Sequence, residues 1–307
     1  MTPPVLRLAT PGSVQGIWRA QHLAALLRAL PLAETGDIRL VPCEPGPGAL
    51  GRVREAVLNG KADVAVHAAD ELPWAEHERL RMVAIPSRGD ARDALCTNLG
   101  SHSKLPPGAL VGARGPRVRL QLGRLHPAVV VVALDEGVAS ALGRLEEDLD
   151  GIVAPLEDLV LLEQQERVTE TFSLLQVVPA AGQAALALEV RADDRETGSR
   201  LAPLNHAASR LCVLTERTVA RRLSAWPGLQ VGTTCALDFG FVAITAVLAP
   251  TLAGPLLRVF RSGPVANARQ IAEAVADELV LLQETYAADD ASPPADQGDP
   301  ARGLLPG

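Results

Sequence analysis

The sequence predicts an α/β protein made of two similar units and a smaller α+β unit. Segments typical of strands and helices alternate from the N-terminus, and the alternation starts again after the turn-rich residues 86–93 (PSRGDARD). The last part of the chain combines extended apolar segments with one long helical segment. Because strands that alternate with helices form mostly parallel sheets covered on both faces, each of the first two units should contain such a sheet.

The first unit begins with an extended apolar segment at residues 5–10 and a turn in which Ser13 is suited to cap a helix. Apolar residues then recur at helical spacing over residues 14–30. The pattern that follows predicts a strand at 38–43, a glycine-rich loop at 44–51, a short helix at 52–60, a strand at 62–67 and a helix at 74–80.

The second unit repeats this order, and the third has hairpin and helix patterns. In the second unit the pattern predicts strands at 109–113, 128–134 and 151–155 and helices at 117–125 and 138–148. A strand at 183–190 and a helix at 205–223 lead to extended segments at 234–249 and 255–263 and a helix at 267–284. The predicted domains are 1–93 with 182–207, then 94–181, then 208–288, and the polar, aperiodic tail 289–307 should be disordered.

Composition narrows the class of protein. A chain of 307 residues is long enough for several cores, and a net charge of −7 argues against nucleic acid as a partner. The N-terminus lacks a signal-peptide pattern, and no apolar run approaches the roughly 18 residues of a membrane span, so a cytoplasmic protein with no membrane partner is expected. The four cysteines and six histidines show no metal-binding or disulfide spacing, so no metal is expected.

Five segments that follow predicted strands should meet at one ligand-binding cleft. In open parallel sheets, ligands bind outside the carboxyl ends of the strands. This rule brings together residues 9–13, 67–73, 112–119, 133–137 and 154–158 between the two α/β units. The expected partner is therefore a small-molecule substrate held in the interdomain cleft.

Within this set, residues 66–73 (VHAADELP) place an imidazole and two carboxylates at the end of a strand. One interpretation is an acidic loop that caps the helix predicted at 74–80. The other is a catalytic group in which Glu71, assisted by Asp70, transfers protons, because adjacent carboxylates can couple and hold one proton more tightly. His67 could reach the same cleft and hydrogen-bond a nearby carboxylate.

Five segments in order resemble hydroxymethylbilane synthase, also called porphobilinogen deaminase. They read LRLATPGSVQGIWRAQHL, NGKADVAVHAADELP, IPSRGDARDALCTN, PAAGQAALALEVRADD and FRSGPVANARQIAEAVADEL, and the likeness extends over residues 5–282. The resemblance implies two type II periplasmic-binding-protein-like α/β domains joined by two hinge strands, and a small C-terminal α+β domain. It also implies a dipyrromethane cofactor attached to a cysteine and the polymerisation of four porphobilinogens with loss of ammonia.

Several positions depart from the pattern of this family. Asp70 stands where the family has a carboxylate-binding lysine, and Glu71 stands where it has its catalytic aspartate. Leu229 occupies the position of the cofactor cysteine, and a thiol is needed there as the nucleophile. Cys235 lies six residues further on and would need a large change of register to replace it. We therefore expect no dipyrromethane cofactor.

Most of the family's substrate-binding arginines are also missing. Their positions hold Pro11, Val118, Asp135 and Ala141. The residues that remain as candidates for substrate binding are Ser13, Arg114, Arg117, Arg167 and Gln183. Each lost guanidinium contact to a carboxylate removes about 1.5–3 kcal/mol, so affinity for a polycarboxylate pyrrole chain should be low.

The sequence thus favours a repurposed relative of hydroxymethylbilane synthase. The leading hypothesis is a cofactor-independent enzyme that uses cleft carboxylates for cyclisation, addition or elimination on a small molecule of a specialised biosynthetic pathway. A second hypothesis is a non-catalytic small-molecule-binding or regulatory protein. A third is a hydroxymethylbilane synthase that acts on porphobilinogen with an atypical cofactor attachment, at Cys235 or another thiol.

Overall fold

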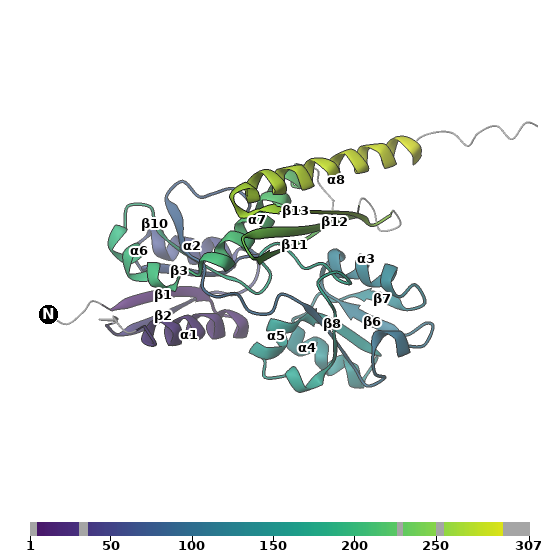
Figure 1. Cartoon of the computed structure of the whole chain (residues 1–307). Helices are drawn as coiled ribbons and strands as arrows, with labels where there is room; N and C mark the ends of the chain where they lie inside the picture. Colours follow the sequence, from purple (N-terminus) through teal and green to yellow (C-terminus); the bar gives the residue numbers. More distant parts are fainter. Residues whose placement is uncertain (1–4, 31–35, 226–229, 250–254, 291–307) are drawn as a thin grey trace, which may run out of the picture.

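The computed structural model describes residues 5–30, 36–225, 230–249 and 255–290. These residues form two five-stranded sheets and one three-stranded sheet, each with its own helices (Figure 1). The strands of the three sheets fall within the three predicted domains, except that Asp93 already belongs to the second sheet. The exact domain limits stay a prediction.

The first sheet has the strand order β2-β1-β3-β10-β4. Strand β1 runs parallel to β2 and β3, whereas β10 is antiparallel to β3 and β4. The bounds are β1 Leu6–Pro11, β2 Ile38–Cys43, β3 Val64–Ala68, β4 Leu80–Ala84 and β10 Leu186–Arg191, with helices α1 Val14–Arg28, α2 Ala49–Leu58 and α6 Arg195–Leu201.

The second sheet repeats this arrangement with the order β7-β6-β8-β5-β9. Strand β6 is parallel to β7 and β8, and β5 is antiparallel to β8 and β9. The bounds are β5 Asp93–Thr97, β6 Leu110–Ala113, β7 Val130–Ala133, β8 Gly151–Pro155 and β9 Val168–Thr171, with helices α3 Gly115–Leu125, α4 Val138–Gly143 and α5 Leu156–Leu161. The chain crosses between the units twice, from β4 to β5 and from β9 to β10, so the two units form the expected type II periplasmic-binding-protein-like pair.

The third unit is an antiparallel sheet with two helices packed on it. Strands β11 Gln230–Asp238, β12 Phe241–Ala249 and β13 Leu257–Pro264 lie side by side, and α7 Ala207–Leu223 and α8 Ala268–Asp290 contribute to the same core (Figure 1). This confirms the predicted α+β unit at the C-terminus. Helix α8 includes the first two residues of the tail predicted to be disordered, and the rest of that tail lies outside the described residues.

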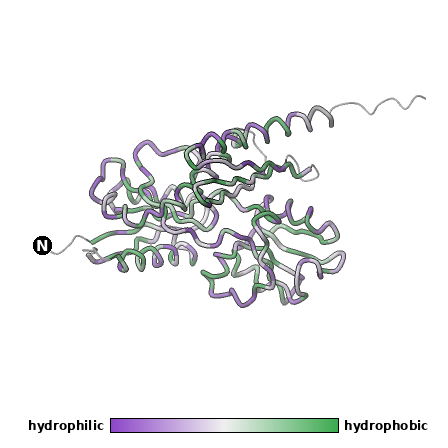
Figure 2. Tube along the Cα trace, in the orientation of Figure 1, coloured by the Kyte–Doolittle hydropathy of each residue, from purple (hydrophilic) through white to green (hydrophobic). Residues whose placement is uncertain are grey.

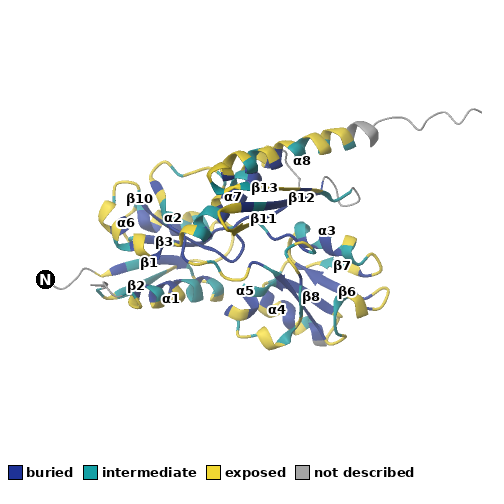
Figure 3. Cartoon of the chain, in the orientation of Figure 1, coloured by how far each residue is buried: buried dark blue, intermediate teal, exposed yellow. Residues whose placement is uncertain are grey.

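Leucine, valine and alanine build the cores, as the low aromatic content requires. The core of the first unit includes Leu8, Leu23 and Leu188, and none of the three side chains is exposed. Apolar segments follow the strands of the three sheets in Figure 2. Inner strands such as β3 and β5 are buried throughout, whereas the edge strands β2, β7 and β13 are mostly half-buried or exposed (Figure 3). Branched and small aliphatic side chains therefore supply most of the apolar burial that stabilises the fold.

Some predicted elements are wrong or incomplete. The helix predicted at 74–80 is absent, because residues 74–79 form turns and bends and Leu80 begins β4. The segment lacks an apolar stripe, and its Leu80 is buried in the sheet instead. Strands β4, β5 and β9 were not predicted, and each is only four or five residues long. Each contains a charged residue, whereas the equally short β6 and β7, which were predicted, are continuous apolar runs.

One buried carboxylate joins the crossing segments to the third unit. Glu216 on α7 is fully buried. Its oxygens accept hydrogen bonds from the guanidinium of Arg88 at 2.7 Å, the backbone N–H of Gly182 at 2.8 Å and the backbone N–H of Cys235 at 2.9 Å. Arg88 and Gly182 belong to the two crossing segments, so Glu216 connects them with β11.

Candidate active site between the two alpha/beta units

Four carboxyl groups gather where the two α/β units meet, and we call them the carboxyl cluster. Asp70 and Glu71 follow the end of β3, and Glu157 and Asp158 lie at the start of α5, directly after β8. The guanidinium of Arg19, on α1, lies between them at 3.8 Å from Glu71 and 3.4 Å from Asp158. Segments 67–73 and 154–158 thus approach each other as the rule for strand ends predicts.

Burial and mutual repulsion keep protons on this cluster. Burial, together with the charge of Glu71, raises the pKa of Asp70 to about 6. Burial likewise raises the pKa of Glu157 to about 7, against the attraction of Arg19. The pKa of Asp158 is also raised by burial, although Arg19 and Arg114 oppose the shift. Carboxyl groups that titrate near neutral pH can both donate and accept protons.

An apolar pocket of about 720 Å³ lies beside the cluster. Trp18 and His22 of α1 stack in its wall with ring centroids 5.0 Å apart, and burial lowers the pKa of His22 so that its ring is neutral at pH 7. Glu157 and Val160 of α5 also line it, together with the first crossing segment at residues 86–90 and residues 203–206. The pocket could hold a small apolar ligand next to the carboxyl group of Glu157.

The residues predicted to be catalytic are not all together. Glu71 is 60% exposed, so its environment is close to water, whereas Asp70 is more enclosed. His67 is buried and contacts Glu189 on β10, with 3.2 Å between Nε2 and Oε2, rather than Asp70 or Glu71. Although burial opposes ionisation, the contacts with His67 and Arg54 hold the pKa of Glu189 at about 2. His67 therefore has the predicted carboxylate neighbour, but in a different cluster.

Two of the predicted substrate-binding residues hold the crossing segments together. The guanidinium of Arg117 donates to the buried Asp93 at 3.0 Å, to the carbonyl oxygen of Val178 at 2.7 Å and to Oε1 of Gln183 at 3.0 Å. Gln183 is itself buried and donates to the carbonyl oxygen of Ala91 at 2.8 Å. These side chains are used within the protein, and their contact with a substrate stays a prediction.

The remaining predicted residues have separate positions. Ser13 caps α1 by accepting a hydrogen bond from the N–H of Gly16 at 3.1 Å, as predicted. Arg114 is exposed at the start of α3, close enough to lower the pKa of Asp158. Arg167 lies at the end of a 3₁₀ helix, and its charge partly opposes the rise that burial causes in the pKa of Cys96. Leu229 lies outside the described residues.

Sequence reasoning did not single out Arg19, Glu157 or Asp158. The two acids lie in residues 154–158, which were expected at the cleft, so their position after a strand was the available signal. Arg19 lies within an ordinary helix, and nothing in its neighbours marks it. No group of three or more His, Cys, Asp or Glu side chains in the described part of the chain is placed to hold a metal ion.

Replacing Asp70 with asparagine should change how stability depends on pH. The folded protein holds a proton on Asp70 up to about pH 6, whereas an unfolded chain loses it near pH 4. Stability of the wild type should therefore fall as the pH rises from 4 to 6, and the penalty should persist above pH 6. Asp70→Asn should remove the part of this slope that comes from Asp70 and increase the free energy of unfolding at pH 8 by about 1–3 kcal/mol.

Urea unfolding between pH 4 and pH 8 measures this effect. Asp193→Asn is the matched control, because the Asp193 side chain is 88% exposed and should leave the profile unchanged. If the profile of Asp70→Asn superimposes on that of the wild type, the pKa of Asp70 is not raised.

Comparison with known proteins gives a family match and several similar folds. The family model described as porphobilinogen deaminase, dipyromethane cofactor binding domain, matches residues 6–199. An ancestral cationic amino acid solute-binding protein is 14% identical, covers 65% of this chain and 87% of its own, and has a TM-score of 0.45. The periplasmic VFT2 domain of BvgS from Bordetella pertussis is 17% identical, covers 65% and 86%, and has a TM-score of 0.40.

No helix among the described residues has the length and apolar character needed to cross a membrane.

Proposed function

The chain belongs to the porphobilinogen deaminase family, and from this premise we propose that it is a cofactor-independent enzyme acting on a small, weakly charged substrate between its two α/β units. The observation that carries the proposal is the carboxyl cluster, in which Asp70 and Glu157 titrate at about pH 6 and 7. Both groups are partly protonated at neutral pH, which suits a general acid and a general base.

The carboxyl cluster and two buried thiols argue against the family's dipyrromethane cofactor in this chain. Its carboxylates would meet the acidic cluster, while Arg117 is already paired with Asp93. Cys96 is buried in β5, and burial raises the pKa of its thiol to about 11. Cys235 lies in the core of the third unit, where its hydrogen bond with Cys212 and burial raise its pKa. Burial and raised pKa values make Cys96 and Cys235 poor nucleophiles, and we derive no step through this cofactor.

The apolar pocket supports the proposed class of substrate. Its walls include Trp18, Leu26 and Val160, which favour an apolar or aromatic group over a chain of carboxylates. Glu157 would exchange a proton with a substrate atom that faces it, and Asp70 would hold or return a proton at the other side of the cluster. Arg19 would pair with Glu71 and Asp158 beside them. Proton transfer of this kind serves cyclisation, addition or elimination.

Intact-mass spectrometry and a porphobilinogen assay separate this proposal from ordinary deaminase activity. The purified full-length chain should have the mass of its sequence, with no covalent adduct, and should not consume porphobilinogen. A mass increase equal to a dipyrromethane, together with consumption of porphobilinogen, would overturn the proposal. Peptide mapping would then identify the cysteine that carries the adduct.

A further inference from the structure

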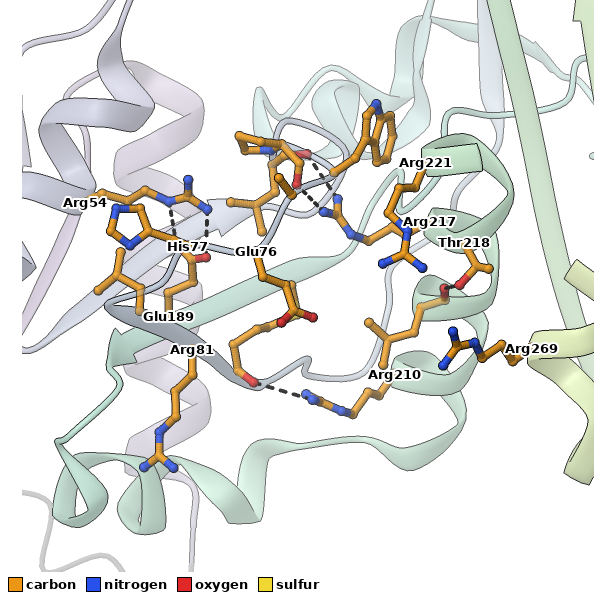
Figure 4. Close-up of a pocket in the computed structure, with 17 residues that line it drawn as sticks. Arg54, Glu76, His77, Arg81, Glu189, Arg210, Arg217, Thr218, Arg221 and Arg269 are labelled. Carbon is orange, nitrogen blue, oxygen red and sulfur yellow. Dashed lines mark hydrogen bonds and ion pairs between the residues drawn. The ribbon is translucent and has the colours of Figure 1, made fainter. Parts of the chain in front are cut away.

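A second pocket, of about 500 Å³, lies between the first and third units and is lined by six arginines. Arg54 and Glu189 approach from one side, and Arg217 and Arg221 from α7 and Arg269 from α8 lie on the other (Figure 4). Arg81 and Arg210 complete the set, and among the described residues the wall contains two carboxylates, Glu76 and Glu189. Six arginines against two glutamates make this pocket positive in a chain whose net charge is −7.

Helix α7 presents one face of side chains to this pocket. Arg210, Leu214, Arg217 and Arg221 are spaced four, three and four residues apart, so they lie along one side of the helix. Like charges four residues apart, such as Arg217 and Arg221, destabilise a helix. The pKa of Arg217 is lowered by burial and by its cationic neighbours Arg54 and Arg221, although Glu189 and Asp70 oppose the shift. The arrangement therefore concentrates positive charge along one face of α7.

Within the described part of the chain, ion pairs neutralise two of the six guanidinium groups. Arg54 binds both oxygens of Glu189 at 2.8 Å, and Arg269 pairs with Glu273 at 2.9 Å. Among the described residues, the other four arginines form no ion pair with a carboxylate. Arg81 donates to the carbonyl oxygen of Asp194, whereas the side chain of Arg221 has no partner there.

Two of these unneutralised arginines are fixed by the backbone. Arg217 donates to the carbonyl oxygens of Ala69 and Leu72 at 2.8 and 3.2 Å, and its guanidinium carbon lies 5.1 Å from the ring centroid of Trp74. Arg210 donates to the carbonyl oxygen of Met82 at 3.4 Å, but its Nη1 is buried without a hydrogen-bond partner among the described residues. A buried guanidinium nitrogen without an acceptor is costly, so Arg210 keeps its full positive charge beside the pocket without compensation.

We propose that this pocket binds a small oxyanion with at least two negative charges, such as a phosphate ester or a polycarboxylate. Arginine is suited to this role because its planar guanidinium matches phosphate and carboxylate oxygens. A ligand held by Arg221 and Arg210 on α7 and by Arg81 on β4 would link the third unit to the first sheet. The lining of this pocket contains no member of the carboxyl cluster, so its ligand would be distinct from the proposed substrate.

Calorimetric titration with inorganic pyrophosphate at low chloride tests the proposal on the full-length chain. The wild type should bind one pyrophosphate in a saturable manner, and Arg221→Gln should weaken the affinity about tenfold or more, which corresponds to one charge-assisted contact. Arg222→Gln is the matched control, because Arg222 is the next residue and pairs with Asp277 at 2.7 Å. Arg19→Gln, at the carboxyl cluster, should also bind normally.

Three results would overturn the proposal. The first is absence of saturable binding by the wild type. The second is an equal loss of affinity in Arg221→Gln and Arg222→Gln, which would indicate only the overall charge of α7. The third is loss of binding in Arg19→Gln with normal binding in Arg221→Gln, which would assign pyrophosphate to the carboxyl cluster.

Discussion

Replacing Glu157 with glutamine should lower turnover of the natural substrate by a factor of about 10² to 10⁴, the usual contribution of a general acid or base. Glutamine has nearly the same shape but cannot exchange a proton at neutral pH. The pKa of about 7 that burial gives Glu157 is lost, while the apolar pocket beside it keeps its walls. Substrate binding and folding should therefore change much less than turnover.

Mass-spectrometric profiling of a metabolite extract, incubated with each variant, measures this effect even though the substrate is unidentified. Compounds consumed by the wild type should persist with Glu157→Gln and with Asp70→Asn. Glu196→Gln is the control, because Glu196 is exposed at the start of α6, outside the carboxyl cluster. Wild-type binding of a compound that is never converted would identify a binding protein instead of an enzyme. Normal turnover by both cluster variants would show that the acid and base lie elsewhere.

Replacing Glu216 with alanine should lower the free energy of unfolding by about 3–5 kcal/mol, the range for breaking a buried ion pair. The change leaves the guanidinium of Arg88 buried without its carboxylate, because that group is 12% exposed and lies 2.7 Å from Glu216. It also removes the acceptor for two backbone N–H groups, at Gly182 and Cys235. Unpaired buried donors each add to the loss.

Urea unfolding followed by circular dichroism measures the change. Glu278→Ala is the control, because Glu278 pairs with Arg261 at the surface, where both side chains are at least 39% exposed. Loss of such an exposed pair should cost about 1 kcal/mol or less. A decrease for Glu216→Ala no larger than that of the control would mean that the connection through Glu216 contributes little to stability.

The sequence predicted those parts of the fold that have long, regular patterns. Helix α1 begins at Val14 with Ser13 as its cap, as expected from the apolar spacing and the turn before it. The prediction of a helix at 74–80 was wrong. The composition of this segment suits a helix, but Leu80 is buried as the first residue of β4. Strand β5, which pairs with β8 and β9, could not be predicted from five residues because its pairing partners lie far away in the chain.

The sequence predicted where the candidate site lies but not all of the residues that form it. The rule for strand ends located Asp70 and Glu71, yet it could not tell which acid is enclosed, because exposure depends on residues such as Arg19 and Asp158 from distant segments. Sequence reasoning favoured Glu71 for its position, whereas in the folded chain Glu71 is 60% exposed and burial raises the pKa of Asp70 to about 6. The sequence also could not show that Arg117 hydrogen-bonds to Asp93 and Val178, because these partners lie next to it only in the folded chain.

The position of β10 within the first sheet has a consequence for the order of folding during synthesis. This strand lies between β3 and β4 and pairs with both, although residues 93–171 of the second unit come before it in the chain. The second sheet can therefore form while the first still lacks a central strand. Until Leu186–Arg191 leaves the ribosome, β3 and β4 lack their shared partner, and their unpaired edges are the kind of surface on which nascent chains associate.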